Sequence, residues 1–334
     1  MPRHSTRTQN QEPGTRRIRW FLVLGSWFLA LAALAALAAC GGSSSPSVPD
    51  FPRVIPLGSG EVSPQIVNSA LAVGGNRFSL GLLDKTSEPI LGAQVHLRFF
   101  DLNGDQPVLK SEADPRFVST QLSFVDESSG NQKRIVGENG VYVATVAFDR
   151  AGRWGLEASV TQDGKALKPV LFQFDVLEKA PGLAVGDPAP PSRQPTTKDV
   201  ADVTDIDSSY PPRPQMHDIT VADALATGKP VVLAFATPAF CESRTCGPVM
   251  DTVMDPLYQK YRDQAIFIHI EPYQLKELRA GIDRIPVPAT EEWQLQTEPW
   301  VFVIDRHGNV AAKFEGIMAL DEVDAALTKV LAQS

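Results

Sequence analysis

The chain has 334 residues, of which 43% are hydrophobic and 21% charged, with 27 prolines and only three cysteines. This composition excludes a collagen, a multi-pass membrane protein, a small disulfide scaffold and a wholly disordered chain, and the length suits two domains. The net charge of −8 argues against nucleic acid as a partner, because phosphate binding requires a basic surface.

The first 39 residues have the layout of an export signal. A basic start with five arginines precedes Trp20–Ala39, which are 20 residues without a charge, and small residues then lead to Cys40. Leu37-Ala38-Ala39-Cys40 resembles the lipobox of bacterial lipoproteins, which implies cleavage before Cys40, a lipid on that cysteine and an extracytoplasmic place at the cell membrane. The alternative is a plain membrane anchor, since about 20 apolar residues can span a bilayer.

Residues 40–61 are rich in Gly, Ser and Pro and are predicted to form a flexible tether. Residues 1–39 carry five arginines and one glutamate, so the rest of the chain has 26 basic and 38 acidic side chains and a net charge of −12. Anionic lipid headgroups repel such a surface, so the lipid anchor would be the main attachment to the membrane.

Residues 62–178 contain short segments that alternate apolar and polar residues, separated by turns, which predicts an antiparallel β-sandwich. Gly140–Tyr142, Phe148 and Ala151–Trp154 resemble the immunoglobulin-like modules of exported bacterial proteins, including the FixH and YtkA types. Nothing in this segment carries chemistry, so a spacer or docking role is expected, with Trp154 in the core. The lone His96 is expected to be structural, because no cysteine or second histidine accompanies it. The predicted strands are 77–83, 94–100, 140–148, 154–161 and 169–177.

Residues 179–217 form the predicted boundary between the domains. Eight prolines lie between Pro181 and Pro214, with acidic residues among them. Such a segment is typical of a semi-rigid linker or of an extended strap along the next domain.

From residue 218 onwards the sequence predicts helices and buried strands. Thr220 and Asp223 predict a capped helix start. Residues 231–236 and 265–270 are apolar without alternation, as in the buried strands of a parallel sheet. Later elements are a helical stretch at 291–295, strands at 300–304 and 310–314, and a final helix at 320–331. A helix of about 14 residues is expected after Cys246, with one apolar face made by Val249, Val253, Leu257 and Tyr261.

This order, a parallel βαβ unit followed by a β-hairpin and a final helix, resembles the thioredoxin fold and its TlpA, peroxiredoxin and Sco branches. The resemblance covers residues 183–334, with Val185–Pro190 as the lead-in segment. It implies a cis peptide bond before Pro299, which would face the active-site cysteines. We therefore expect a multidomain chain with an N-terminal all-β immunoglobulin-like sandwich and a C-terminal α/β thioredoxin-like domain at 218–334.

The two cysteines of this domain depart from the thioredoxin motif, in which two residues separate them. Cys246-Gly247-Pro248-Val249 resembles Cys-Gly-Pro-Cys without its last cysteine, and an alternative alignment places Phe240-Cys241 at the Trp-Cys position. Residues five apart on one regular helix lie more than about 8 Å apart, whereas a disulfide needs Cα atoms within about 7 Å. A bonded pair therefore requires Cys241 in a loop that folds back over a helix beginning near Cys246.

The resemblance implies thiol–disulfide exchange without a cofactor. The partners would be exported proteins with disulfides or a membrane electron donor. Cys246 is the expected nucleophile, because a helix start and Arg244 would stabilise its thiolate, and Cys241 is the expected resolving thiol. Pro299 and its neighbours would present their backbone to the partner.

The strand at 231–236 lacks the acid that thioredoxins bury below their cysteines, so Glu271 or Glu298 is the expected proton acceptor. Two alternatives are open. One is a non-enzymatic binding module with a structural disulfide in an exposed loop. The other is a copper-handling protein of the Sco type, in which thiolates and one imidazole would bind the metal. The candidate imidazoles are those of His269, His307 and His217.

Overall fold

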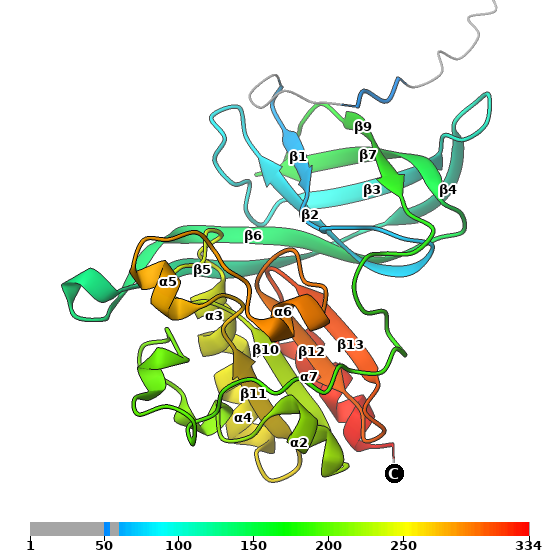
Figure 1. Ribbon diagram of the computed structural model, residues 1–334. Coiled ribbons are helices and arrows are strands. Elements are labelled where there is room, and N and C mark those ends of the chain that lie inside the picture. Colours follow the sequence, from blue (N-terminus) through cyan, green and yellow to red (C-terminus); the bar gives the residue numbers. More distant parts are fainter. Residues whose placement is uncertain (1–49, 54–59, 334) are drawn as a thin grey trace, which may run out of the picture. The chain divides into compact units, whose positions relative to one another are not determined.

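The computed structural model describes residues 50–53 and 60–333 (Figure 1). The predicted export signal, Cys40 and most of the predicted tether lie outside these residues. Within the described part of the chain, no helix is both long and apolar enough to cross a membrane.

The first half of the described chain forms two antiparallel sheets. One has the order β1-β2-β6-β5, and the other has the order β4-β3-β7-β8, with β9 also paired to β7. Their inner faces share one apolar core, in which Trp154 and Phe148 are buried and meet edge to face. The immunoglobulin-like assignment stays a prediction. The strands are β1 Ser63–Ile66, β2 Gly74–Leu83, β3 Gln94–Asp101, β4 Val108–Ala113, β5 Arg116–Asp126, β6 Gln132–Phe148, β7 Gly152–Gln162, β8 Lys165–Ala166 and β9 Val170–Val176.

The five predicted strands are present, and β1, β4, β5 and β8 are strands that the sequence analysis missed. The most consequential of these is β5, which pairs along its whole length with β6 around the 3-10 turn η1 (Glu127–Ser129). Residues 132–138 of β6 are exposed throughout, including Ile135 and Val136. This end of the hairpin is therefore held by backbone pairing and has no buried face. For the same reason its sequence lacks the alternation of apolar and polar residues that predicts a strand.

The proline-rich segment runs as an extended strap along the C-terminal domain (Figure 1). The amide of Gly186 donates to Val310 O, and that of Ala189 donates to Gly308 O, each at 2.8 Å. Met216, near the end of the strap, is fully buried in the domain core. The strap contains two short 3-10 helices, η2 Val203–Asp205 and η3 Pro214–Met216.

The C-terminal sheet has the order β11-β10-β12-β13. β10 is parallel to β11 and antiparallel to β12, which in turn pairs with β13. This confirms the predicted order of a parallel βαβ unit, a hairpin and a final helix. The bounds are α2 Val221–Ala226, β10 Val231–Phe235, α3 Cys246–Val249, the π-helical turn η4 Met250–Met254, α4 Asp255–Tyr261, β11 Ile266–Ile270, α5 Leu275–Arg279, α6 Pro288–Glu292, β12 Trp300–Ile304, β13 Val310–Glu315 and α7 Leu320–Leu331.

β10 lacks apolar–polar alternation because both faces of its sheet are covered. Val232 and Ala234 belong to the core that includes residues of α3, α4 and α7, whereas Leu233 and Phe235 belong to the core that includes residues of α2 and α6. All five residues of β10 are fully buried. Packing on both faces therefore holds the end of β10 in place. The loop that carries Cys241 begins at this end of the strand.

The helix that follows Cys246 is interrupted by a π-turn that the sequence analysis did not predict. Within it, the amide of Asp255 donates to Met250 O, five residues back. Pro256 comes next and has no N–H with which to continue the α-helical pattern. The predicted apolar face is confirmed, because its four residues are buried in one core: Val249, Val253, Leu257 and Tyr261.

Candidate active site

Cys241 and Cys246 form a disulfide, with their Cα atoms 6.0 Å apart. Cys246 is the first residue of α3, and Cys241 lies in the loop that folds back over this helix start, as the geometric argument requires. Arg244, with a left-handed φ of 59°, reverses the loop between them. Both cysteines are fully buried. The expectation of an exposed disulfide loop is therefore wrong for the two cysteines themselves.

The helix start supports Cys241 rather than Cys246. The amide of Cys246 donates to Sγ of Cys241 at 3.3 Å, and the hydroxyl oxygen of Ser243 lies 3.2 Å from the same sulfur. Hydrogen bonds to sulfur favour the thiolate form. The sequence predicts such stabilisation for Cys246, whereas these hydrogen bonds reach the sulfur of Cys241.

Arg244 also lies elsewhere than the sequence suggests. Its guanidinium group lies over the ring of Phe124, 4.4 Å from the ring centroid, in a cation–π contact. Phe124 belongs to β5 of the sandwich, so this contact joins the disulfide loop to the first domain. The predicted support of a cysteine thiolate by Arg244 is replaced by this contact.

The Glu298–Pro299 peptide bond is cis, as the sequence resemblance predicts. A carboxylate oxygen of Glu298 and both cysteine sulfurs lie within 4.8 Å of one another. The Glu298 side chain is only 6% exposed, and burial raises its pKa to about 8, against the opposing effect of Arg284, whose Nη1 lies 3.4 Å from Oε1. At neutral pH this carboxyl group therefore holds a proton beside the disulfide.

The other candidate acid, Glu271, belongs to a different buried cluster. Its carboxylate accepts the amide N–H of Ser208 at 2.7 Å and lies 3.9 Å from Nε2 of His269. Burial raises the pKa of Glu271 well above its ordinary value. Of the two predicted proton acceptors, the structure brings Glu298 to the cysteines.

The candidate imidazoles of the copper alternative do not join the cysteines. In the described part of the chain, the potential ligand group that contains the two sulfurs is completed by Glu298, whereas His217 and His269 group with Asp207. His307 is exposed in the turn between β12 and β13. The structure thus separates imidazole and thiol ligands.

Strand β5 of the sandwich runs beside the disulfide loop. The amide of Ser123 donates to Arg244 O at 3.0 Å, and that of Val125 donates to Pro238 O at 3.4 Å. At Gly247 a Cβ atom would lie 3.1 Å from Oγ of Ser123, so a larger residue would have little room there. The loop and the helix start are therefore covered by a strand that the sequence analysis did not predict.

A cleft of about 360 Å³ lies next to this covered loop. One wall is formed by β2 and β6, including Leu82 and Val141, and the other includes Ser243, Thr245 and Glu298. The cleft therefore reaches the buried carboxyl and the loop between the cysteines.

No protein-family profile matches the chain, and no curated protein matches it. Among solved structures, it is similar to a candidate thiol:disulfide interchange protein DsbE from Chlorobium tepidum, with 19% identity over 45% of this chain and 99% of that chain and a TM-score of 0.30. A thioredoxin-like superfamily protein is also similar, with 20% identity over 35% of this chain and 88% of that chain and a TM-score of 0.25.

Proposed function

We propose that the C-terminal domain exchanges disulfides with exported proteins, or with a membrane electron donor, through Cys241 and Cys246. The observation that carries this proposal is the closeness of a helix-start disulfide and a buried carboxyl group that holds a proton. A disulfide that only staples the loop does not need the acid. It would also stabilise little, since even a 15-residue loop is worth only about 3 kcal/mol.

In the reduced chain, the thiolate of Cys241 attacks one sulfur of the partner disulfide and forms a mixed disulfide, and the other partner sulfur leaves as a thiolate. Cys246 then loses its proton and attacks Sγ of Cys241, which releases the second partner sulfur. Two thiols of the chain become one disulfide, and the partner disulfide becomes two thiols. The reverse sequence oxidises a partner.

Glu298 transfers the protons in this scheme. Its acid form protonates the partner sulfur that leaves in the first step, and the carboxylate so formed then accepts the proton of Cys246 in the second step. A pKa of about 8 lies close to that of an ordinary thiol, about 8.5, which suits transfer in both directions. The adjacent cleft gives an extended partner segment a place beside Glu298.

Access to the sulfurs requires β5 to leave the disulfide loop. Phe124→Ala removes the cation–π contact with Arg244, so we expect the disulfide to be reduced by dithiothreitol about two- to fivefold faster. The rate is measured by acid quenching, alkylation and mass spectrometry. Val108→Ala, at an exposed position of β4, is the control and leaves the rate unchanged. Equal rates in all three proteins would show that the pair is reached without displacement of β5.

The burial of both cysteines favours a second candidate function, a non-enzymatic binding module in which the disulfide holds the loop in shape. Partner proteins would then bind without forming any covalent adduct. The cysteine variants described in the Discussion separate the two functions.

We further propose that lipid on Cys40 anchors the chain at the extracytoplasmic face of the cell membrane. The lipobox-like sequence and the acidic remainder of the chain support this proposal. In cells fed a labelled fatty acid, Cys40→Ser should abolish labelling of the protein. Cys40→Ser is not cleaved and keeps its apolar stretch, so membrane association does not distinguish it from the wild type. The decisive readouts are the loss of labelling and the loss of cleavage. A plain anchor would be unlabelled in the wild type too.

A further inference from the structure

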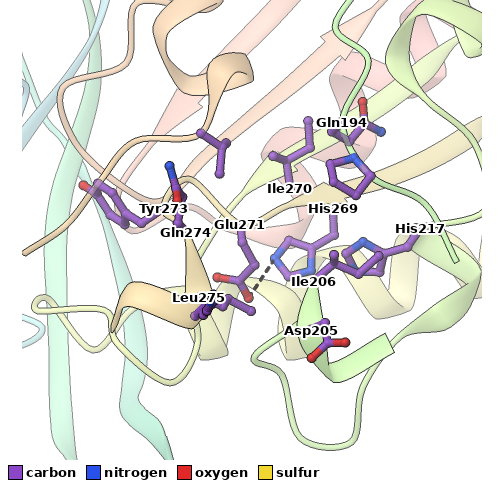
Figure 2. Close-up of a pocket in the computed structure, with 13 residues that line it drawn as sticks. Gln194, Asp205, Ile206, His217, His269, Ile270, Glu271, Tyr273, Gln274 and Leu275 are labelled. Atoms are coloured by element: carbon purple, nitrogen blue, oxygen red, sulfur yellow. Dashed lines mark ion pairs between the residues drawn. The ribbon is translucent and has the colours of Figure 1, made fainter. Parts of the chain in front are cut away.

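A second buried polar cluster lies where the strap meets β11. His217 and Asp207 on the strap and His269 on β11 are all at most 2% exposed. Nε2 of His217 lies 3.4 Å from Oδ2 of Asp207, and Nδ1 of His269 lies 3.6 Å from Oδ1. Figure 2 shows the two imidazole rings next to each other, and their centroids are 5.0 Å apart. Three potential ligands thus converge from two separate segments.

The hydrogen bonding of His269 determines which of its ring nitrogens carries the proton. Nε2 lies 2.9 Å from the carbonyl oxygen of Ala236, which can only accept, so Nε2 is the donor. With Nε2 as the donor, the neutral ring leaves a free lone pair on Nδ1, and Nδ1 has no hydrogen-bond partner among the described residues. That lone pair faces the carboxylate of Asp207.

The carboxylate of Asp207 is held in its ionised form by its surroundings. It accepts the amide N–H of Ser209 at 2.8 Å and that of Arg213 at 2.6 Å. The free lone pair of His269 therefore faces a negative charge in a buried place, which is unfavourable unless a cation lies between them. Within the described chain, Nε2 of His217 and Nδ1 of His269 both lack a hydrogen-bond partner.

We propose that Asp207, His217 and His269 bind a divalent transition-metal ion such as Zn²⁺. Ligand bonds of about 2.0–2.2 Å in a tetrahedral site place neighbouring ligand atoms about 3.3–3.6 Å apart. His217 Nε2 lies 3.4 Å from Oδ2 of Asp207 and His269 Nδ1 lies 3.6 Å from Oδ1, and one ligand atom from each residue lies within 4.8 Å of the others. Donation of the second ring nitrogen to a backbone carbonyl, as in His269, is the usual orientation of a histidine ligand. Imidazole nitrogen and carboxylate oxygen are both ligands that zinc accepts.

The cluster adjoins a cavity and is connected to the disulfide loop. The cavity has a volume of about 240 Å³ and is lined in part by His217, His269 and Glu271 (Figure 2). Next to Asp207, the hydroxyl of Ser208 accepts the amide N–H of Ala239 at 3.1 Å. A bound ion would therefore hold the strap at Asp207 and Ser208 in place. This part of the strap accepts a hydrogen bond from the loop that leads to Cys241.

The test uses the full mature chain after treatment with a chelator. Calorimetric titration with Zn²⁺ should show one equivalent bound, the melting temperature should rise, and Co²⁺ should give the visible absorption of a four-coordinate ion. His217→Gln should lower the Zn²⁺ affinity more than about tenfold. His307→Gln is the matched control and should bind as the wild type does, because this histidine is exposed in a turn.

The double variant Cys241→Ser/Cys246→Ser separates this site from the thiols, and it should still bind one Zn²⁺. Circular dichroism establishes that each variant is folded, and the Co²⁺ spectrum of the wild type provides a test that needs no variant. The proposal is overturned if the wild type binds neither ion, if folded His217→Gln binds as tightly as the wild type, or if binding is lost with the cysteines. None of these outcomes depends on disulfide exchange.

Discussion

Cys241→Ser is expected to abolish reduction of insulin disulfides by the chain, whereas Cys246→Ser is expected to trap the partner in a stable mixed disulfide. The amide of Cys246 and the hydroxyl group of Ser243 support a thiolate on Cys241, so Cys241 attacks. Without Cys246 no second thiol releases the partner. Insulin turbidity and mass spectrometry of the partner adducts measure the two effects.

Urea unfolding of the oxidised wild type and of both single variants is the matched control. If the disulfide is only structural, both variants lose the same free energy of unfolding and neither traps a partner. If Cys241→Ser traps the partner and Cys246→Ser does not, Cys246 is the nucleophile, as the sequence alone suggests. The exchange proposal requires an adduct in one of the two.

Glu298→Gln is expected to slow the resolving step about a hundredfold at neutral pH, because glutamine keeps the shape of the side chain but carries no transferable proton. The rate of the wild type should show an inflection near pH 8, where Glu298 titrates, and the variant should lack it. Single-turnover stopped-flow measurements across this pH range provide both results. Glu242→Gln is the control, because Glu242 also pairs with Arg284 but is 83% exposed. Equal profiles for all three proteins would remove Glu298 from the mechanism.

The same carboxyl group links folding stability to pH. Burial raises the pKa of Glu298 from 4.5 to about 8, so the folded chain binds this proton more tightly than the unfolded chain does. Its contribution to stability is full below about pH 4.5 and is lost as the pH rises to about 8. We expect the wild type to lose stability relative to Glu298→Gln across this window in urea unfolding. A parallel pH dependence of the two proteins would contradict the burial of a protonated acid.

The C-terminal sheet was predictable because its signals are local. The apolar run at 231–235 reflects a strand covered on both faces, and β12 and α7 have the bounds that the sequence predicts. The cis peptide at Pro299 followed from the family resemblance. For the strands and the helix, the residues that carry the signal lie within one element.

The cover over the disulfide and the roles of the two thiols were not predictable, because both depend on contacts between distant residues. β5 meets the disulfide loop through backbone hydrogen bonds, which leave no mark in the sequence. Arg244 has a left-handed backbone conformation, which brings the amide of Cys246 towards the sulfur of Cys241. The number of residues between the two cysteines does not predict this conformation. Asp207 and His217 lie in a segment whose composition is that of a linker, so their burial beside His269 was missed.

The reduction potential of the Cys241–Cys246 pair tests the central claim most directly. The chain from residue 41 onwards is equilibrated in thiol buffers of graded potential, and the oxidised fraction is measured by alkylation and mass spectrometry. A redox-active pair should have a potential of about −120 to −270 mV, the range of known exchange proteins. A pair that stays oxidised below about −300 mV would be a structural disulfide and would contradict the proposed exchange activity.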